Sequence, residues 1–370
     1  MRVAIVINTS WNIFNYRQGL IKALIANGCE VIAIAPPDEF SVRLKELGCT
    51  FVPLPMDNKG MNPVKDFWLY LRMLLVYKDL KPDYILHYTV KPNVFGTLAA
   101  ASLGIKCISN VSGLGTAFIR KGLLLFVVKQ LYRFAFQFPQ RIFFQNKDDR
   151  DLFLNLSILD KNKTDVLPGS GINASKFKIV EIERNKSFVF LLIARLLADK
   201  GILEYAMASK MLKEKGYQFE AQLIGFFDRE SKYNISTSEL DNWVENGYIR
   251  FLGESTNIQA DIAKVNCVVL PSYREGTPRS ILEAMAMAKP VITTNVPGCK
   301  EVLVEGENGF FCESKNAQSL ANAMIKMLES SEESLRTMGL HGRKIVEEKF
   351  DESIVVEKYL SEIFAKFTTE

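Results

Sequence analysis

The chain has 370 residues, of which 48% are hydrophobic and 24% charged, and its formal net charge is +4. This length is too great for one ordinary core and predicts two domains, while the composition excludes a chain dominated by disorder. Residues 1–170 hold 21 Lys and Arg against 13 Asp and Glu, whereas residues 171–370 hold 25 against 29. The first half is therefore basic and the second mildly acidic.

In the first 170 residues, short β-branched segments alternate with amphipathic segments of helical length. The predicted strands are residues 2–8, 30–35, 50–54, 83–87, 106–110, 141–145 and 163–167. The predicted helices are residues 14–27, 39–47, 63–79, 92–103, 121–137 and 147–156. Continuous apolar strands separated by helices are typical of a parallel sheet covered on both faces.

The alternation stops at residues 168–186, a polar stretch with Gly169 and Gly171 that predicts a linker and hinge, and then resumes. Further strands are predicted at 187–194, 219–225, 248–252, 266–270 and 290–294, and further helices at 200–215, 256–263, 279–288, 316–328, 333–348 and 353–366. We therefore expect an α/β protein with two Rossmann-like, doubly wound domains facing across a cleft, at 1–172 and 186–350. A C-terminal helix, 353–370, capped by Asp351, should pack back on the first domain.

The six cysteines form no C-x-x-C pair and lie in or beside apolar segments. This pattern favours small buried side chains over a zinc site. The opening segment MRVAIVINTS enters a strand directly and lacks the features of a signal peptide. No apolar run approaches the ~20 residues that span a bilayer, so we expect a cytoplasmic protein.

Two cations follow the first predicted strand of the second domain, in LIARLLADKGI. Arg195 comes just after the apolar run, and Lys200 opens the next helix. Ligands of open α/β sheets bind beyond the carboxyl ends of the strands, so two cations at this place favour a bound polyanion. Either cation alone is equally typical of a solvated surface charge.

A second group of polar residues, PSYREGTPRSILEA, follows the fourth strand of that domain. Thr277 is predicted to cap a helix that Pro278 begins, and the amides near Gly276 at the helix start favour an anion. Glu275 and Glu283 repel phosphate, but a carboxylate accepts hydroxyl groups in pairs. Together with the two cations, this group predicts a site for a nucleotide diphosphate sugar.

At this point the chain resembles a known family. The ordered segments ARLLADKG, PSYREGTPRSILEAMAMAKPVITTNVPGCKEVL and ENGFF are similar to the family 4 retaining glycosyltransferases, which have the GT-B fold. Within that family, YTVKPNVFGTLAAASLG and SNVSGLGTAF resemble a bacterial branch, N-acetylgalactosaminyltransferases among them, that extends polyprenyl-diphosphate-linked sugars for surface glycan or glycoprotein assembly.

The resemblance implies a role for each residue of the predicted site. Arg195 and Lys200 would bind the donor diphosphate and stabilise the leaving nucleotide, and with Glu275 they would be the catalytic residues. Glu283 would hold the ribose and Glu275 the transferred sugar. Transfer would proceed with retention from a UDP-sugar, such as UDP-N-acetylgalactosamine, with no metal and no cofactor required.

Backbone groups complete the expected donor site, with the amides of Gly276 and Thr277 assisting the diphosphate. Many family members place a first-domain histidine near the donor sugar, but this chain has 2 histidines and neither fits. His87, at a strand end, is more typical of a structural residue, and His341 of a surface residue. Gly113 and Gly115 of SGLGTAF occupy the corresponding region, where they are expected to bring the backbone close to the sugar.

Two further motifs of the first domain allow alternatives. In NTSWNIFNYRQG, Asn12, Asn15 and Arg17 are candidates for binding an acceptor phosphate, but Arg17 also fits a surface residue of a first helical turn. In DDRDL, Asp149 and Asp151 match the D-x-D of metal-dependent transferases. We favour a helix start there, because acidic residues stabilise the first turn.

Two basic amphipathic stretches, 63–78 and 119–137, are expected to dock on a membrane surface, with core helices as the alternative. Together with a lipid-linked acceptor, they predict a protein peripheral to the inner face of the cell membrane. Nucleic acid is not an expected partner, because its recognition modules are missing.

Two other functions use the same donor. The first is a nucleotide-sugar epimerase, which needs acid and base side chains beside the sugar, and few are available here. The second is a non-catalytic nucleotide-sugar-binding protein.

Overall fold

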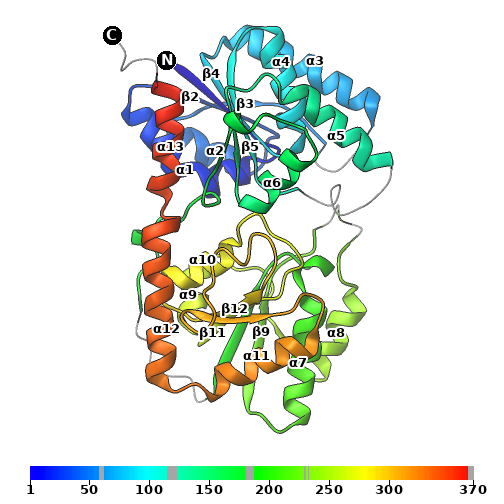
Figure 1. The fold of residues 1–370 in the computed structure, drawn as a ribbon, viewed down its shortest axis with the longest axis vertical. Helices are drawn as coiled ribbons and strands as arrows, with labels where there is room; N and C mark the ends of the chain where they lie inside the picture. Colours follow the sequence, from blue (N-terminus) through cyan, green and yellow to red (C-terminus); the bar gives the residue numbers. More distant parts are fainter. Residues whose placement is uncertain (58–61, 115–122, 181–186, 229–230, 232, 366–370) are drawn as a thin grey trace. The chain divides into compact units, whose positions relative to one another are not determined.

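The computed structural model describes residues 1–57, 62–114, 123–180, 187–228, 231 and 233–365. It divides into two compact units, each with its own parallel sheet (Figure 1). The first unit is Met1–Gly171 with Glu352–Glu370, and the second is Ile172–Asp351. The predicted class, two doubly wound α/β domains, is confirmed.

The first unit holds a seven-stranded sheet in the order β3-β2-β1-β4-β5-β6-β7. Its strands are β1 (Arg2–Val6), β2 (Glu30–Ala35), β3 (Thr50–Pro53), β4 (Tyr84–Tyr88), β5 (Lys106–Val111), β6 (Arg141–Phe144) and β7 (Thr164–Val166). Its helices are α1 (Ser10–Ala26), α2 (Phe40–Glu46), α3 (Pro63–Leu80), α4 (Thr97–Ser102), α5 (Leu123–Ala135), α6 (Lys147–Asn155) and α13 (Glu352–Phe364), with a π-helical turn, η1 (Pro92–Gly96), before α4.

Both faces of the first sheet are covered by helices, as its apolar strands require. One buried cluster joins the sheet to α1, α2 and α13, and another joins it to α3 and α4. Figure 1 shows these two groups of helices on opposite sides of the sheet. The local sequence sets the helix starts: the side chains of Thr9 and Asn62 accept hydrogen bonds from the first turns of α1 and α3.

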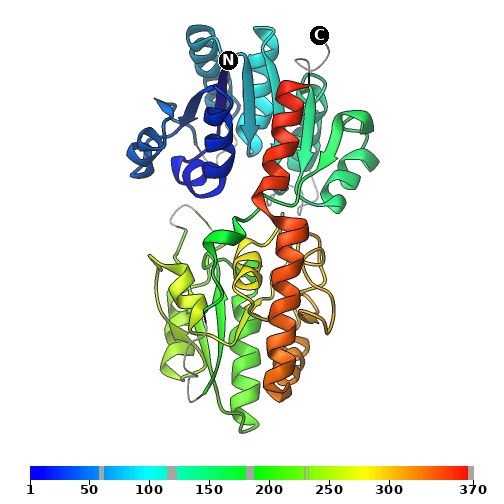
Figure 2. The same cartoon turned by 90° about the vertical axis from the view of Figure 1, so that its left-hand side faces the viewer.

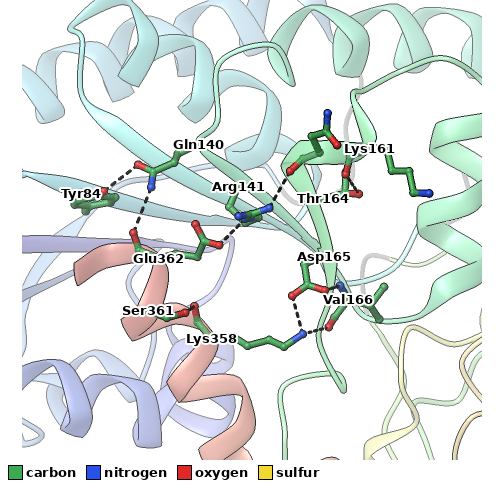
Figure 3. A network of polar contacts seen from close by, with 11 residues as sticks. Tyr84, Gln140, Arg141, Lys161, Thr164, Asp165, Val166, Lys358, Ser361 and Glu362 are labelled. Atoms are coloured by element: carbon green, nitrogen blue, oxygen red, sulfur yellow. Dashed lines mark hydrogen bonds and ion pairs between the residues drawn. The ribbon is translucent and has the colours of Figure 1, made fainter. Parts of the chain in front are cut away.

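The last helix, α13, is built into the first unit. Val355, Tyr359 and Ile363 lie in the same buried cluster as β1 and α1. On its polar side, Lys358 Nζ lies 2.7 Å from Asp165 Oδ2, and Arg141 Nε lies 2.6 Å from Glu362 Oε1 (Figure 3). The view of Figure 2 shows this helix, in red, running along the unit to which it belongs.

The second unit holds a six-stranded parallel sheet in the order β10-β9-β8-β11-β12-β13. Its strands are β8 (Phe188–Ile193), β9 (Phe219–Ile224), β10 (Arg250–Phe251), β11 (Cys267–Leu270), β12 (Val291–Thr294) and β13 (Gly309–Cys312). Its helices are α7 (Ile202–Glu214), α8 (Thr237–Glu245), α9 (Ile258–Ala263), α10 (Arg279–Ala286), α11 (Ala317–Glu329) and α12 (Glu332–Ile345). Short turns complete it: η3 (Ala174–Lys176), η4 (Ala198–Lys200) and η5 (Val346–Phe350).

The predicted linker is wrong over its first part. Ile172, Ala174 and Phe177 are buried in the core of the second unit, beside α9 and α10. The second unit therefore begins at Ile172, and not at residue 186, because these apolar side chains complete one face of its sheet. Residues 181–186 of the predicted hinge lie outside the described part of the chain.

Candidate functional site

The predicted donor-site residues of the second unit gather where β8 and β11 lie side by side. The first strand connections run from β8 toward β10, and the later ones from β11 toward β13, so the order of the sheet reverses between these two strands. The register pairs Leu191 with Val268, which brings the carboxyl ends of both strands to one edge. Ligands of doubly wound sheets bind at such a switch point.

A close backbone contact joins the two loops that leave this edge. A Cβ at Gly201, whose φ is +72°, would collide with the carbonyl oxygen of Pro271, so only glycine fits. The amide of Tyr273 also donates to the carbonyl of Asp199, at 2.8 Å. Because the backbones of these two loops touch here, the residues that follow the two strands lie beside one another.

Lys200 and Glu275, predicted to bind different parts of one donor, form an ion pair. Lys200 Nζ lies 2.5 Å from Glu275 Oε1, and their side chains are only 14% and 16% exposed. Ser272, two residues beyond β11, donates its hydroxyl proton toward the same oxygen, at 2.7 Å. Lys200 ends the turn η4, two residues before α7, so it does not open a helix as predicted.

The backbone of Glu275 is held by the loop that follows β12. Its amide donates to the carbonyl of Pro297, at 3.1 Å. A Cβ at Gly298, whose φ is +85°, would collide with the carbonyl oxygen of Glu275 and would crowd that of Gly276. This loop therefore fixes the backbone of Glu275 and Gly276.

Arg195 lies two residues beyond β8 and is the more accessible of the two predicted cations, with 47% of its side chain exposed. Its Nη1 donates to Asp228 Oδ2, at 2.9 Å. Asp228 follows β9, the other neighbour of β8, and its backbone carbonyl accepts from the side chain of Asn234, at 2.8 Å.

Glu283 lies in α10 and is paired within that helix. Arg279 Nε donates to Glu283 Oε1, at 2.9 Å, and both side chains are largely buried. Burial raises the pKa of Glu283, and the positive charge of Arg279 opposes that rise. α10 begins at Arg279, as the predicted range 279–288 has it, with Pro278 at the N-cap position. The expectation that Pro278 begins the helix and Thr277 caps it is one residue early.

The structure brings Arg195, Lys200, Glu275, Gly276, Thr277 and Glu283 together on the loops and helix that leave β8 and β11. Gly113 belongs to the first unit, two residues after β5, with φ +142°. Gly115 lies outside the described residues. The roles of all these residues at a donor stay predictions.

His87 is a structural residue of the first unit. It is fully buried at the end of β4, where its Nε2 and Nδ1 lie 3.1 Å from Tyr77 Oη and 3.3 Å from Thr97 Oγ1. Burial lowers its pKa to about 3, so the ring is neutral at physiological pH.

The structure bears on the alternatives for two other first-unit motifs, the one that contains Arg17 and the D-x-D motif. Arg17 is no first-turn surface residue: it is buried in the middle of α1, with its guanidinium 4.2 Å from the ring centroid of Tyr88. The D-x-D motif marks a helix start, as predicted, since α6 begins at Lys147. Its cap Asn146 accepts from the amide of Asp149, at 2.8 Å.

Sequence reasoning missed three partners in this site: Asp228, Ser272 and Arg279. The i,i+4 spacing of Arg279 and Glu283 is the signal that identifies their pair. Ser272 stands in the quoted motif, but a hydroxyl near a carboxylate is too common to stand out. No sequence signal connects Asp228 with Arg195, because 32 intervening residues and the strand order bring them together.

Comparison with known proteins identifies the family. The glycosyl transferases group 1 model matches residues 174–345, and the glycosyl transferase 4-like domain matches residues 14–169. The N,N'-diacetylbacillosaminyl-diphospho-undecaprenol alpha-1,3-N-acetylgalactosaminyltransferase of Campylobacter jejuni is 30% identical over 97% of each chain. The chain belongs to the group 1 glycosyltransferases. This glycosyltransferase is thus an enzyme of the predicted class.

Two further comparisons support this assignment. The UDP-Gal:alpha-D-GlcNAc-diphosphoundecaprenol alpha-1,3-galactosyltransferase of Escherichia coli is 26% identical, over 75% of this glycosyltransferase and 74% of that enzyme. The fold matches that of Anabaena HepE, solved in complex with UDP and glucose, with a TM-score of 0.80 over 99% of each chain and 18% identity. Within the described residues, no helix is both long and apolar enough to cross a bilayer.

Proposed function

We propose that this glycosyltransferase moves an N-acetylhexosamine, such as N-acetylgalactosamine, from a UDP-sugar to a saccharide linked to polyprenyl diphosphate. The observation that carries this proposal is the 30% identity, over 97% of the chain, with an enzyme whose name states that donor sugar and an undecaprenol-linked acceptor. The E. coli relative, also named for a diphosphoundecaprenol acceptor, supports the same acceptor class.

The second unit binds the donor in this proposal. Arg195 and Lys200 hold the diphosphate, with the amides of Gly276 and Thr277 beside it. Glu275 accepts hydroxyl groups of the transferred sugar, and Glu283, which Arg279 helps to keep ionised despite its burial, accepts the ribose diol. The support is that these side chains converge at the switch point of one sheet.

The reaction needs one bond exchanged for another. The bond between the anomeric carbon of the sugar and the β-phosphate oxygen breaks, and an acceptor hydroxyl oxygen bonds to the same face of that carbon. The hydroxyl proton goes to the departing diphosphate. Charge on the leaving diphosphate increases during this step, so Arg195 and Lys200 accelerate it by stabilising that charge.

A UDP-release assay tests the proposal against its alternatives. With UDP-N-acetylgalactosamine as donor, release that depends on a polyprenyl-diphosphate-linked saccharide supports transfer. Isomerised donor without release supports an epimerase, and binding without turnover supports a non-catalytic protein. Lys200→Ala is expected to lower transfer at least about a hundredfold. Lys344→Ala, in an exposed i,i+4 pair of the same unit, is the matched control.

The basic first unit docks on the cytoplasmic leaflet in this proposal, through α3 and α5. On α3, Val64, Phe67, Trp68 and Leu75 are 57–65% exposed. At 100° per residue they form one stripe on the side of the helix opposite its buried residues Leu69, Met73 and Tyr77.

Cations flank the apolar stripe of α3, as an interfacial helix requires. Lys65, Arg72 and Lys78 are exposed on α3, and on α5 Phe126 and Phe134 are 59% and 56% exposed. The part of the predicted stretch at 119–122 lies outside the described residues. Apolar side chains at the acyl boundary and cations at anionic headgroups support peripheral docking on the inner face of the membrane.

Vesicle binding tests the docking surface. The double variant Phe67→Ser with Trp68→Ser is expected to bind vesicles of phosphatidylglycerol and phosphatidylcholine at least about tenfold more weakly, because two large apolar side chains are lost. Leu340→Ser, which changes an exposed leucine of the second unit, is the control. Equal binding by the double variant and the control contradicts this surface.

A further inference from the structure

Three cations of the predicted donor site are each paired with a carboxylate. Arg195 pairs with Asp228 at 2.9 Å, Lys200 with Glu275 at 2.5 Å, and Arg279 with Glu283 at 2.9 Å. A diphosphate that binds Arg195 and Lys200 therefore competes with carboxylates that already make charge-assisted hydrogen bonds to them.

Repulsion disfavours the present positions of the carboxylates once the diphosphate has bound. A carboxylate that shares a cation with a phosphate lies within a few ångströms of its negative charge, and like charges at that distance repel. The backbone of Glu275 is held by Pro297 and Gly298, so its side chain is the part that turns away.

The two carboxylates differ in what they do once displaced. Glu275, in the proposed function on which this inference rests, gains hydroxyl groups of the transferred sugar. UDP has no transferred sugar, so it offers Glu275 no hydroxyl groups in place of Lys200. The proposed function assigns the sugar to Glu275 and not to Asp228, so the loss of Arg195 by Asp228 is the same for both ligands.

We propose that Asp228 and Glu275 are intramolecular competitors of the diphosphate for Arg195 and Lys200, and that Glu275 makes this competition depend on the sugar. UDP-sugar binds because its hydroxyl groups take Glu275 away from Lys200. After transfer the sugar leaves, Glu275 returns to Lys200, and UDP is displaced. Asp228 thus weakens the binding of both ligands alike, and Glu275 is the residue that distinguishes between them.

Calorimetric titration of UDP and of UDP-N-acetylgalactosamine tests this proposal. Glu275→Gln is expected to bind UDP at least about fivefold more tightly than the unmodified protein and UDP-N-acetylgalactosamine more weakly, because Lys200 is released but the sugar loses its ionised acceptor. Asp228→Asn is expected to tighten both ligands by similar factors. Glu348→Gln, which removes the same charge from an exposed pair with Lys344, is the control.

The outcomes separate this proposal from the function on which it rests. If Asp228→Asn and Glu275→Gln bind UDP only as tightly as the control Glu348→Gln, the proposed competition is overturned. If Glu275→Gln tightens UDP and the UDP-sugar equally, the competition stands and the proposed sugar contact fails. If none of the variants binds UDP, the donor site itself is wrong. Melting curves show whether each isosteric variant is folded, and if one is not, the other decides.

Discussion

The buried His87 makes the first unit sensitive to acid, by an amount that follows from its surroundings. Its ring nitrogens lie between Tyr77 and Thr97, and Gly96 packs so closely that a Cβ there would lie 2.7 Å from the ring. Burial lowers the pKa from 6.5 to about 3. The imidazole is hard to protonate in the folded protein and easy to protonate in the unfolded chain. Acid therefore favours the unfolded chain.

The sign and the size of the effect follow from proton linkage. Below pH 6.5 the unfolded chain binds a proton that the folded unit does not, so the contribution of His87 is complete at neutral pH and is lost as the pH falls. At pH 5 the free energy of unfolding of the first unit should be lower than at pH 8 by about 2 kcal/mol on this account alone.

Urea unfolding at both pH values, followed by hydrogen exchange in peptides of the first unit, measures this difference. His87→Gln removes the titrating group and keeps a hydrogen-bond donor near Tyr77. Between pH 8 and pH 5, the free energy of unfolding of this variant should fall by about 2 kcal/mol less than that of the unmodified protein. His341→Gln, at the other histidine, which is exposed on α12, should behave as the unmodified protein. An unchanged pH dependence in His87→Gln refutes the reasoning.

Three further predictions concern the second unit and the thiols. Gly298→Ala should lower transfer at least about tenfold with little change in helix content by circular dichroism, because the added methyl group displaces the backbone of Glu275; normal turnover contradicts this. Arg279→Met should raise the pKa of Glu283 further and reduce the preference for UDP over 2'-deoxy-UDP about tenfold; an unchanged preference removes Glu283 from the ribose. All six cysteines are buried, and burial raises the pKa of Cys49 to about 11 and of Cys107 to about 12, so a disulfide reagent should label none before unfolding. Labelling of a thiol in the native protein is the opposite result.

The sequence was sufficient to predict most of the fold, and the exceptions have physical causes. The seven predicted strands of the first unit all match, because most of them are short runs rich in apolar residues between helices. The prediction missed β13, a short strand at the edge of the sheet beside β12, and α8, in which few positions are apolar. Ser236 and Glu239 of α8 form a capping box, a signal that was available.

The site was predictable as a set of residues and not as a set of partners. The order of the motifs along the sequence predicted that Arg195, Lys200, Glu275 and Glu283 belong to one site. Their pairing with one another and with Asp228 depends on strand order and side-chain rotamers, which no local pattern specifies. The linker prediction failed for a related reason: Ile172 and Phe177 look isolated among polar residues, and only the neighbouring sheet explains their burial.

The return of α13 to the first unit affects the order in which the protein can mature during translation. The second unit is one continuous stretch, Ile172–Asp351, and all of it has been synthesised before α13 is made. The cluster that contains Val355, Tyr359 and Ile363 is incomplete until then. A chain truncated within the last helix therefore has a second unit with all its residues and a first unit that exposes apolar side chains to chaperones and proteases.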